Sequence, residues 1–306
     1  MISNYSRYSD IQMKNRNKVL FQPLFVIGSP RSGTTLMRLI LTCHSHVVIP
    51  PECGFLLWLR SKYGDFTYSA QSLRLFVDEL AMTKKFETWN ISIEDLYTLL
   101  SNLKPTSYAE LCASVYLIYS EAQGKKANIW GDKNNYYINH LDELVAIYPT
   151  AKFLHVVRDG RDVACSYKDV VASNFSEKYA PKLCSNIEEI ASEWSSNVRI
   201  ADAFLTTVDS SNCRVIKYED LVSDPESNVS WICEWLGVDY ESQMLNFYSS
   251  NKKNGLEPEE TLAWKKRTMT PISSDTVGRY MQQMSKAEGD AFLTIAGKVL
   301  SIHGYI

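Results

Sequence analysis

The sequence predicts an α/β fold in which a doubly wound parallel sheet is flanked by helices within a single domain. Three short, largely apolar runs indicate strands at Leu24–Ile27, Lys152–Val157 and Cys213–Tyr218. The apolar residues in these runs are mostly consecutive and do not alternate with polar residues, which is typical of parallel strands covered on both faces. Helical patterns lie between these runs, and strands that alternate with helices favour this class of fold.

The apolar spacing predicts helices at residues 36–41, 93–100, 108–121, 139–148, 161–171, 187–205 and 225–236. Pro225 stands at a favourable first helical position. In a doubly wound sheet, ligands bind at the carboxyl ends of the strands. Residues that directly follow a predicted strand are therefore the first candidates for a functional site.

Length and charge limit the organisation and the partners. The chain has 306 residues, of which 45% are hydrophobic, and a net charge of −3. We expect a flexible N-terminal arm at residues 1–18 and one domain at residues 19–306, since no repeat or linker interrupts the chain. The charge balance provides no basic field for nucleic acid or anionic lipid, so a bound anion must be held locally.

Apolar runs and cysteines bear on the cellular setting. The longest apolar stretch, residues 19–30, is shorter than the roughly 18 residues of a membrane span and contains Gln22 and two prolines. It runs directly into a glycine loop, so neither a membrane anchor nor a cleaved signal peptide is expected. The seven cysteines are odd in number and never spaced as Cys-x-x-Cys, which favours a reducing, cytoplasmic setting and no zinc site.

The segment Gly28–Thr35 has the Gly-x4-Gly spacing of a phosphate-binding loop and lies between a strand and a helix. Backbone N–H groups there can bind a phosphate without a side-chain charge. Thr34 stands where a nucleoside triphosphatase has lysine, and the cation comes earlier, at Arg31. Because no acidic residue clearly closes a strand to hold Mg²⁺, phosphoryl transfer from ATP lacks two usual supports. The bland alternative is a glycine turn that only reverses the chain.

A second anion-binding pattern follows the middle strand. Arg158 comes directly after it, and Ser166 lies eight residues later, about two turns into the next helix. A guanidinium group and a hydroxyl suit a phosphate monoester. Taken alone, Arg158, Asp159, Arg161 and Asp162 are also typical of a solvated charge cluster.

These two segments resemble motifs of the sulfotransferases that use 3′-phosphoadenosine-5′-phosphosulfate (PAPS). Residues 29–35 resemble the family's 5′-phosphosulfate loop, in the form typical of the bacterial, Golgi-type and tyrosylprotein branch. Residues 156–166 resemble its 3′-phosphate motif. Further similarity extends the match from about residue 24 to about residue 280, at residues 130–133, 217–221, 224–225 and 235–237.

The resemblance implies a P-loop-like sheet, PAPS as the donor, the bisphosphate PAP as the product, and no metal. The implied nucleotide-binding residues are Arg31, Ser32, Gly33, Thr34, Thr35, Arg158, Ser166, Tyr218 and Arg279. Tyr218 resembles the family's adenine-contacting tyrosine, although a buried core tyrosine fits as well. Arg279 lies in a segment that resembles the family's late Gly-Arg element, which completes the 3′-phosphate site.

Sulfuryl transfer needs a base for the acceptor proton and positive charge near the leaving oxygen. Glu52 follows a short strand and two prolines, and it resembles the base of the tyrosylprotein and related bacterial enzymes. His44 and His46 are the alternative bases, and a helix cap is the alternative role for Glu52. Arg31 and Lys133 are the candidate cations, although relatives have Thr-Pro where this chain has asparagines after the lysine.

The resemblance implies that a variable region, here residues 53–128, builds the acceptor pocket, and these residues are rich in aromatic side chains. This composition suits a small organic molecule as the acceptor. The attacking group stays open between a hydroxyl and an amine, and a sugar or a peptide tyrosine also stays possible. Oligomeric state is open. Two rival functions are a nucleotide kinase and a non-catalytic nucleotide-binding module.

Overall fold

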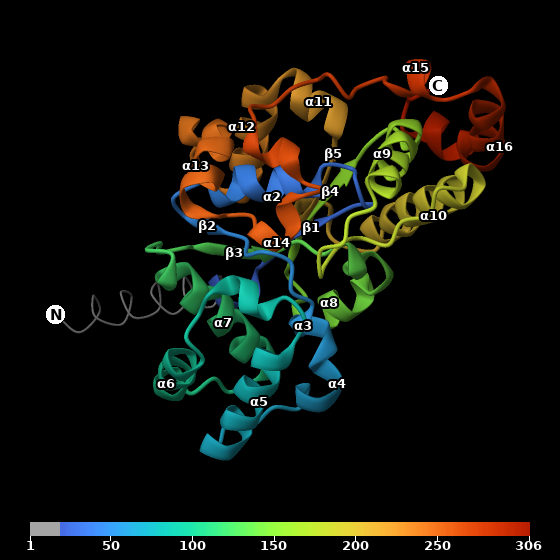
Figure 1. The fold of residues 1–306 in the computed structure, drawn as a ribbon. Helices are drawn as coiled ribbons and strands as arrows, with labels where there is room; N and C mark the ends of the chain where they lie inside the picture. Colours follow the sequence, from blue (N-terminus) through green and yellow to red (C-terminus); the bar gives the residue numbers. More distant parts are fainter. Residues whose placement is uncertain (1–18) are drawn as a thin grey trace. The chain divides into compact units, whose positions relative to one another are not determined.

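The protein folds around a five-stranded parallel sheet, and a computed structural model describes its residues 19–306. The strand order is β2-β3-β1-β4-β5, with helices flanking the sheet (Figure 1). The strands are β1 Leu24–Ile27, β2 Val47–Val48, β3 Ile129–Asp132, β4 Lys152–Val157 and β5 Cys213–Lys217. The predicted α/β class and parallel sheet are confirmed. The arm predicted for residues 1–18 lies outside the described residues.

Burial explains why the middle strands are apolar throughout. All four residues of β1 are buried, and so are all residues of β4 after Lys152. β1 pairs in parallel with β3, with Phe25 opposite Asp132, and β4 pairs in parallel with β5. Parallel pairing brings the carboxyl ends of neighbouring strands to the same edge of the sheet.

The chain groups into two compact units. Unit 1 contains the described residues up to Phe25, together with Ser45–Asn134 and His140–Lys152. Unit 2 contains Val26–His44, Asn135–Asn139 and Phe153–Ile306. The residues of the predicted site therefore fall into two groups, one in each unit.

Unit 1 holds β2, β3 and a set of mostly short helices. These are α3 Phe55–Trp58, α4 Arg60–Tyr63, α5 Ala70–Met82, the 3₁₀ turn η1 Phe86–Trp89, α6 Ile93–Leu103, α7 Tyr108–Ala122 and α8 Leu141–Ile147. Each of the longer ones, α5, α6 and α7, begins after a serine whose hydroxyl accepts a backbone N–H of the first turn.

Many aromatic residues of this unit lie in its core. Phe55, Phe76 and Trp89 are almost fully buried. The ring of Phe55 lies 5.7 Å from that of Trp89, and Tyr116 stacks on Trp130 with centroids 4.4 Å apart. These buried rings account for part of the aromatic richness of residues 53–128, so the composition alone does not identify a small-molecule pocket.

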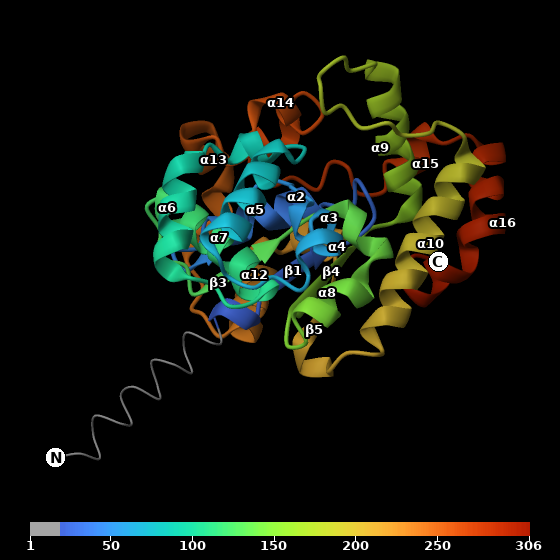
Figure 2. The ribbon, with the colours of Figure 1, turned by 90° about the horizontal axis from the view of Figure 1, so that it is seen from below.

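Unit 2 holds β4, β5 and the remaining helices. Its α-helices are α2 Thr34–Thr42, α9 Gly160–Ser173, α10 Ile187–Leu205, α11 Tyr218–Ser223, α12 Pro225–Leu236, α13 Phe247–Asn254, α14 Glu259–Leu262, α15 Tyr280–Gln283 and α16 Lys286–Ile302. Its 3₁₀ turns are η2 Asn135–Asn139, η3 Ser210–Asn212, η4 Ser242–Asn246 and η5 Lys266–Met269. Figures 1 and 2 show α9, α10 and α16 side by side, and they share one apolar cluster around Trp194.

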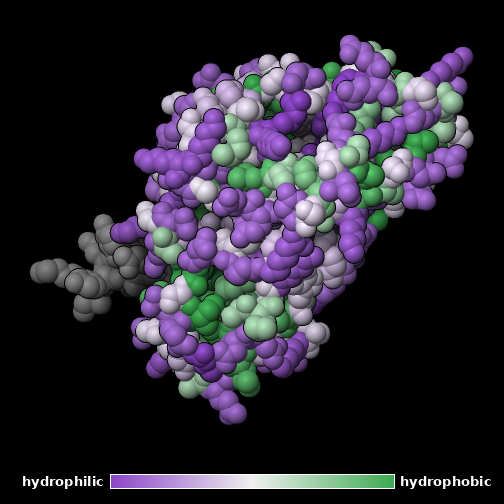
Figure 3. Space-filling view, viewed as in Figure 1, coloured by the Kyte–Doolittle hydropathy of each residue, from purple (hydrophilic) through white to green (hydrophobic). Residues whose placement is uncertain are grey.

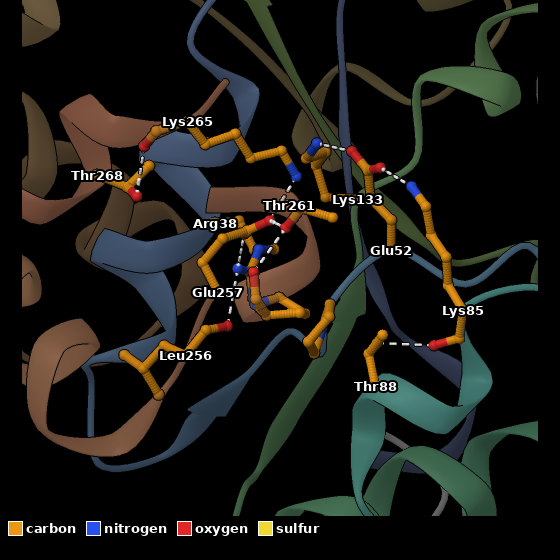
Figure 4. A network of polar contacts seen from close by, with 12 residues as sticks. Arg38, Glu52, Lys85, Thr88, Lys133, Leu256, Glu257, Thr261, Lys265 and Thr268 are labelled. Carbon is orange, nitrogen blue, oxygen red and sulfur yellow. Dashed lines mark hydrogen bonds and ion pairs between the residues drawn. The ribbon is translucent and has the colours of Figure 1, made fainter. Parts of the chain in front are cut away.

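A buried ion cluster ties α2 to the segment before α14. Arg38 on α2 donates to the Leu256 carbonyl at 2.9 Å and pairs with Glu257, which also binds Lys265 (Figure 4). Burial alone would raise the pKa of Glu257, but the charges of Lys265 and Arg38 outweigh it and lower that pKa to about 2. The cluster therefore stays ionised and fixes the helix that follows the glycine loop.

The bounds of several elements differ from the prediction. The helix predicted at 139–148 begins only at Leu141, after the 3₁₀ turn η2, and Tyr218 begins α11 instead of closing β5. The helices α5 and α16 and the strand β3 were not predicted. β3 contains Gly131 and ends in Asp132, so it lacks the continuous apolar run of β1 and β4.

β3 also corrects one argument against an ATP-dependent kinase. It ends in Asp132, so an acidic residue does close a strand. That carboxylate is fully buried and accepts a hydrogen bond from the Tyr116 hydroxyl. The loop still differs from that of a nucleoside triphosphatase, because Thr34 stands in place of the lysine.

The surface in Figure 3 is mostly hydrophilic, with smaller apolar areas between the polar residues. None of the helices described for residues 19–306 is long and apolar enough to cross a membrane. Within the same residues, no three His, Cys, Asp or Glu side chains are grouped so that they could hold a metal ion.

Candidate functional site

The loop between β1 and α2 is compact. The N–H of Ser32 donates to the Ser29 carbonyl at 3.2 Å and closes a tight turn. Arg31 and Gly33 both have left-handed backbone, with φ angles of 67° and 95°. α2 then begins at Thr34 with no side-chain cap and no acidic residue in its first turn. Backbone N–H groups in such a turn and at such a helix start are suited to an anion.

Two glycines of the loop are needed for close packing. A Cβ at Gly28 would lie 2.4 Å from the Val156 carbonyl oxygen, and one at Gly33 would lie 2.5 Å from the Tyr218 ring. Any larger residue would displace β4 or the tyrosine. The glycine spacing of residues 28–33 is thus explained by the approach of β4 and α11 to the loop.

Arg31 is the first of three guanidinium groups close together in unit 2. Its Nε donates to the Ser166 hydroxyl on α9 at 3.0 Å. Burial lowers the pKa of Arg31 to about 10, and the neighbouring charges of Arg158 and Arg279 add to this effect. Like charges that repel one another in a partly buried place are stabilised when an anion binds between them.

Arg158 is held by backbone carbonyls and a ring. It follows the last residue of β4 and donates to the carbonyl oxygens of Arg31 at 3.2 Å and Thr276 at 2.8 Å. Its guanidinium carbon lies 4.3 Å from the centre of the Tyr218 ring. Burial lowers the pKa of Arg158. The alternative reading of Arg158 as part of a solvated charge cluster does not hold, because this side chain is buried.

Asp162 binds the backbone on both sides of Arg279, an arrangement that the sequence did not predict and that we call the clamp. Asp162 on α9 accepts the N–H groups of Gly278 at 2.7 Å and Tyr280 at 3.0 Å. Burial, the largest effect, raises the pKa of Asp162, and the two N–H groups oppose that rise. The Arg279 side chain reaches Asp169 at 2.7 Å. Asp162 therefore fixes the residues on both sides of Arg279.

Several buried donors in this group have no hydrogen-bond partner within the described part of the chain. They are the hydroxyls of Ser29 and Ser32 and the Nε atoms of Arg158 and Arg279. Buried polar groups in native proteins are almost always paired. Unpaired hydroxyl and guanidinium donors beside an anion-binding loop fit a bound phosphate group. The remaining predicted loop residues are the first two of α2, Thr34 and Thr35.

Tyr218 packs against the glycine loop and Arg158. It is buried, its ring packs on Gly33 and under Arg158, and its hydroxyl lies 3.0 Å from the Thr276 hydroxyl. One face of the ring is therefore covered by a guanidinium group. Its contact with adenine stays a prediction.

The predicted base and one predicted cation lie together in unit 1. Glu52 accepts Lys133 on one carboxylate oxygen and Lys85 on the other, the latter at 2.8 Å (Figure 4). Lys133 follows β3 and is almost fully buried. The sequence predicts Glu52 and Lys133 as separate candidates. It does not predict Lys85, because no local pattern connects Lys85 with Glu52, 33 positions earlier.

The two histidines have other partners. His44 is buried in unit 2, with Nε2 2.8 Å from the Asp239 carbonyl oxygen. His46 belongs to unit 1 and lies at the surface, with Nδ1 3.4 Å from the Lys126 carbonyl oxygen. These contacts favour a structural role for His44 and leave Glu52 as the better candidate base.

A model described as the sulfotransferase family matches residues 23–242 of this chain. That range is more than half of the chain and contains the glycine loop, Glu52, Lys133 and the Arg158 segment. The chain therefore belongs to the sulfotransferase family.

Among curated proteins, a protein-tyrosine sulfotransferase of Drosophila melanogaster is 25% identical over 290 residues. The match covers 92% of this chain and 51% of the fly protein, so the chain spans about half the length of that relative.

Solved structures share the fold. The sulfotransferase domain of the Synechococcus PCC 7002 olefin synthase has a TM-score of 0.59 at 22% identity, covering 91% of this chain and 95% of that domain. A mouse sulfotransferase solved in complex with PAP has a TM-score of 0.51 at 12% identity, covering 92% of this chain and 85% of that protein.

We expect Asp162→Asn to weaken the binding of PAP by about tenfold or more, because an amide cannot accept both backbone N–H groups as the carboxylate does. Titration calorimetry measures this, with thermal unfolding to verify the fold. Asp169→Asn is the matched control: it removes only an exposed partner of Arg279 and should change the affinity little. Equal affinities for Asp162→Asn and the wild type would refute the role of the clamp.

Proposed function

We propose that this protein transfers the sulfuryl group of PAPS to a hydroxyl group of an acceptor. The observation that carries the proposal is the set of unpaired, buried donors around the glycine loop, which includes Ser32, Arg158 and Arg279. Two phosphate-binding segments suit a nucleotide with separate 5′ and 3′ phosphate groups. Membership of the sulfotransferase family supports the same donor.

Bound PAPS supplies a sulfur atom that forms a bond to the acceptor oxygen while its bond to the bridging phosphate oxygen breaks. PAP keeps the electron pair of the broken bond, and the acceptor hydroxyl loses its proton. The protein must therefore accept one proton and stabilise negative charge on the departing phosphate. In this proposal Arg31 stabilises that charge, and its low pKa for an arginine still leaves it protonated at neutral pH.

Glu52 is the proposed base. As a carboxylate beside two ammonium groups, it can accept the acceptor proton directly. Once Glu52 is protonated, its negative charge no longer neutralises Lys133. The ammonium charge of Lys133 then becomes available to the developing negative charge, so one proton transfer serves both needs of the reaction.

For the acceptor, we favour a phenolic hydroxyl of a peptide tyrosine. The fly relative is named for acting on protein tyrosine. The aromatic residues do not by themselves select a small organic acceptor, since Phe55, Phe76 and Trp89 are core residues. A small alcohol, phenol, sugar or amine forms the comparison arm of the experiment.

The proposed setting is cytoplasmic. None of the seven cysteines, all of which lie within residues 19–306, forms a disulfide. Free cysteines without any disulfide are usual in reducing compartments. No nucleic-acid partner is proposed, given the net charge of −3.

The test is a turnover assay with PAPS carrying a labelled sulfuryl group and no divalent metal. A tyrosine peptide, a simple phenol, an alcohol, a saccharide and an amine are offered separately. We expect label on the tyrosine peptide, with one PAP formed per sulfated product. Consumption of ATP that depends on Mg²⁺, with PAPS inert, would instead establish the kinase alternative. Tight PAP binding without a single turnover would establish a non-catalytic module.

Replacing the proposed base tests its role. Glu52→Gln keeps the shape of the side chain but removes its basicity, so kcat for a hydroxyl acceptor should fall about a hundredfold or more while PAP binding persists. His44→Asn and His46→Asn should leave kcat close to that of the wild type. An active Glu52→Gln beside an inactive His44→Asn would transfer the role of base to the histidine.

A further inference from the structure

The segment that carries Glu52 is held by three contacts from residues 83–89. The indole N–H of Trp89 donates to the Pro51 carbonyl at 2.9 Å. Lys85 binds Glu52 at 2.8 Å. The Thr83 hydroxyl lies 3.6 Å from the Cys53 sulfur. Three successive residues, 51 to 53, thus each contact one residue of the same short turn, and we call residues 83–89 the bracket.

The backbone of the bracket is strained at Lys85. This residue has a φ of 72°, a left-handed conformation that a lysine seldom adopts. The Lys85 carbonyl accepts both the N–H and the hydroxyl of Thr88, at 3.1 and 2.7 Å (Figure 4). Strain of this kind persists only where the surrounding contacts enforce it, and it occurs often at functional sites.

The ion pair of Lys85 is not an ordinary surface pair. The Lys85 and Glu52 side chains are 19% and 16% exposed. An exposed pair between Lys62 and Glu79 in the same unit has 57% and 37% exposure. Shielding from water strengthens a charge pair and lets it restrict the geometry of the carboxylate.

We propose that Lys85 is the positioning residue for the base Glu52. The inference rests on the proposed function. The two carboxylate oxygens of Glu52 are divided between two lysines, one on Lys133 and one on Lys85. If the reaction recruits the charge of Lys133, the contact with Lys85 keeps the carboxyl group in place. Lys85 acts through Glu52 and does not itself touch the reacting atoms.

Three single variants test this role with a tyrosine peptide as acceptor. Lys85→Met keeps the apolar stem and removes the charge, so kcat should fall on the order of tenfold while the Kd of PAP changes less than about twofold. Lys85→Arg restores a cation and should recover most of the rate. Lys84→Met, which removes the neighbouring exposed lysine, should behave as the wild type. A wild-type rate in Lys85→Met, or failure of Lys85→Arg beside an unaffected Lys84→Met, would overturn the proposal.

A double variant separates positioning from general stability. Added to Glu52→Gln, Lys85→Met should lower kcat by less than about twofold, because the base on which it acts is already absent. A full tenfold loss in that background would mean that Lys85 acts independently of Glu52. A fully active Glu52→Gln would refute the base itself and hence the proposed function at that point. If Glu52→Gln falls below detection, the contrast between Lys85→Met and Lys85→Arg decides.

Discussion

The burial of Arg31 and Arg158, together with their repulsion from each other and from Arg279, is the constraint on which the proposed nucleotide site of unit 2 depends. Arg31, Arg158 and Arg279 approach one another from the glycine loop, the end of β4 and the late loop. Backbone carbonyls and Asp162 hold the groups and their loops in place. This arrangement raises the free energy of the unliganded protein. An anion that binds between the guanidinium groups offsets that free energy, so the arrangement favours binding of the proposed nucleotide.

In unit 1, one carboxylate lies between two cations, whereas the three guanidinium groups of unit 2 are like charges. Glu52 lies between Lys133 and Lys85, after two prolines that restrict its backbone. Each of its two carboxylate oxygens thus binds an ammonium group. In the proposed mechanism, protonation of Glu52 leaves these positive charges without their carboxylate partner, which links the proposed base to electrostatic stabilisation. The bracket at residues 83–89 gives this carboxylate a fixed place.

The sequence predicted the parts of the molecule that have local signals. The bounds of β1, β4, α10 and α12 follow from apolar runs and capping residues, and they match the structure. β3 lacks a continuous apolar run, because Gly131 and Asp132 make up half of it, so its sequence gives no strand signal. The role of Asp162 could not be predicted, because its backbone partners lie more than 110 residues later in the chain and the local sequence shows only a cluster of charges. Lys85 carries no motif at all, and only the tertiary structure brings it to Glu52.

The most direct test of the account compares PAP with AMP by titration calorimetry on the full chain. AMP has no 3′ phosphate, so it forgoes the charged hydrogen bonds proposed for Arg158, Ser166 and Arg279. Loss of such a set should cost about 3 kcal/mol or more, which corresponds to at least about a hundredfold tighter binding of PAP. Equal affinities for PAP and AMP would contradict the account.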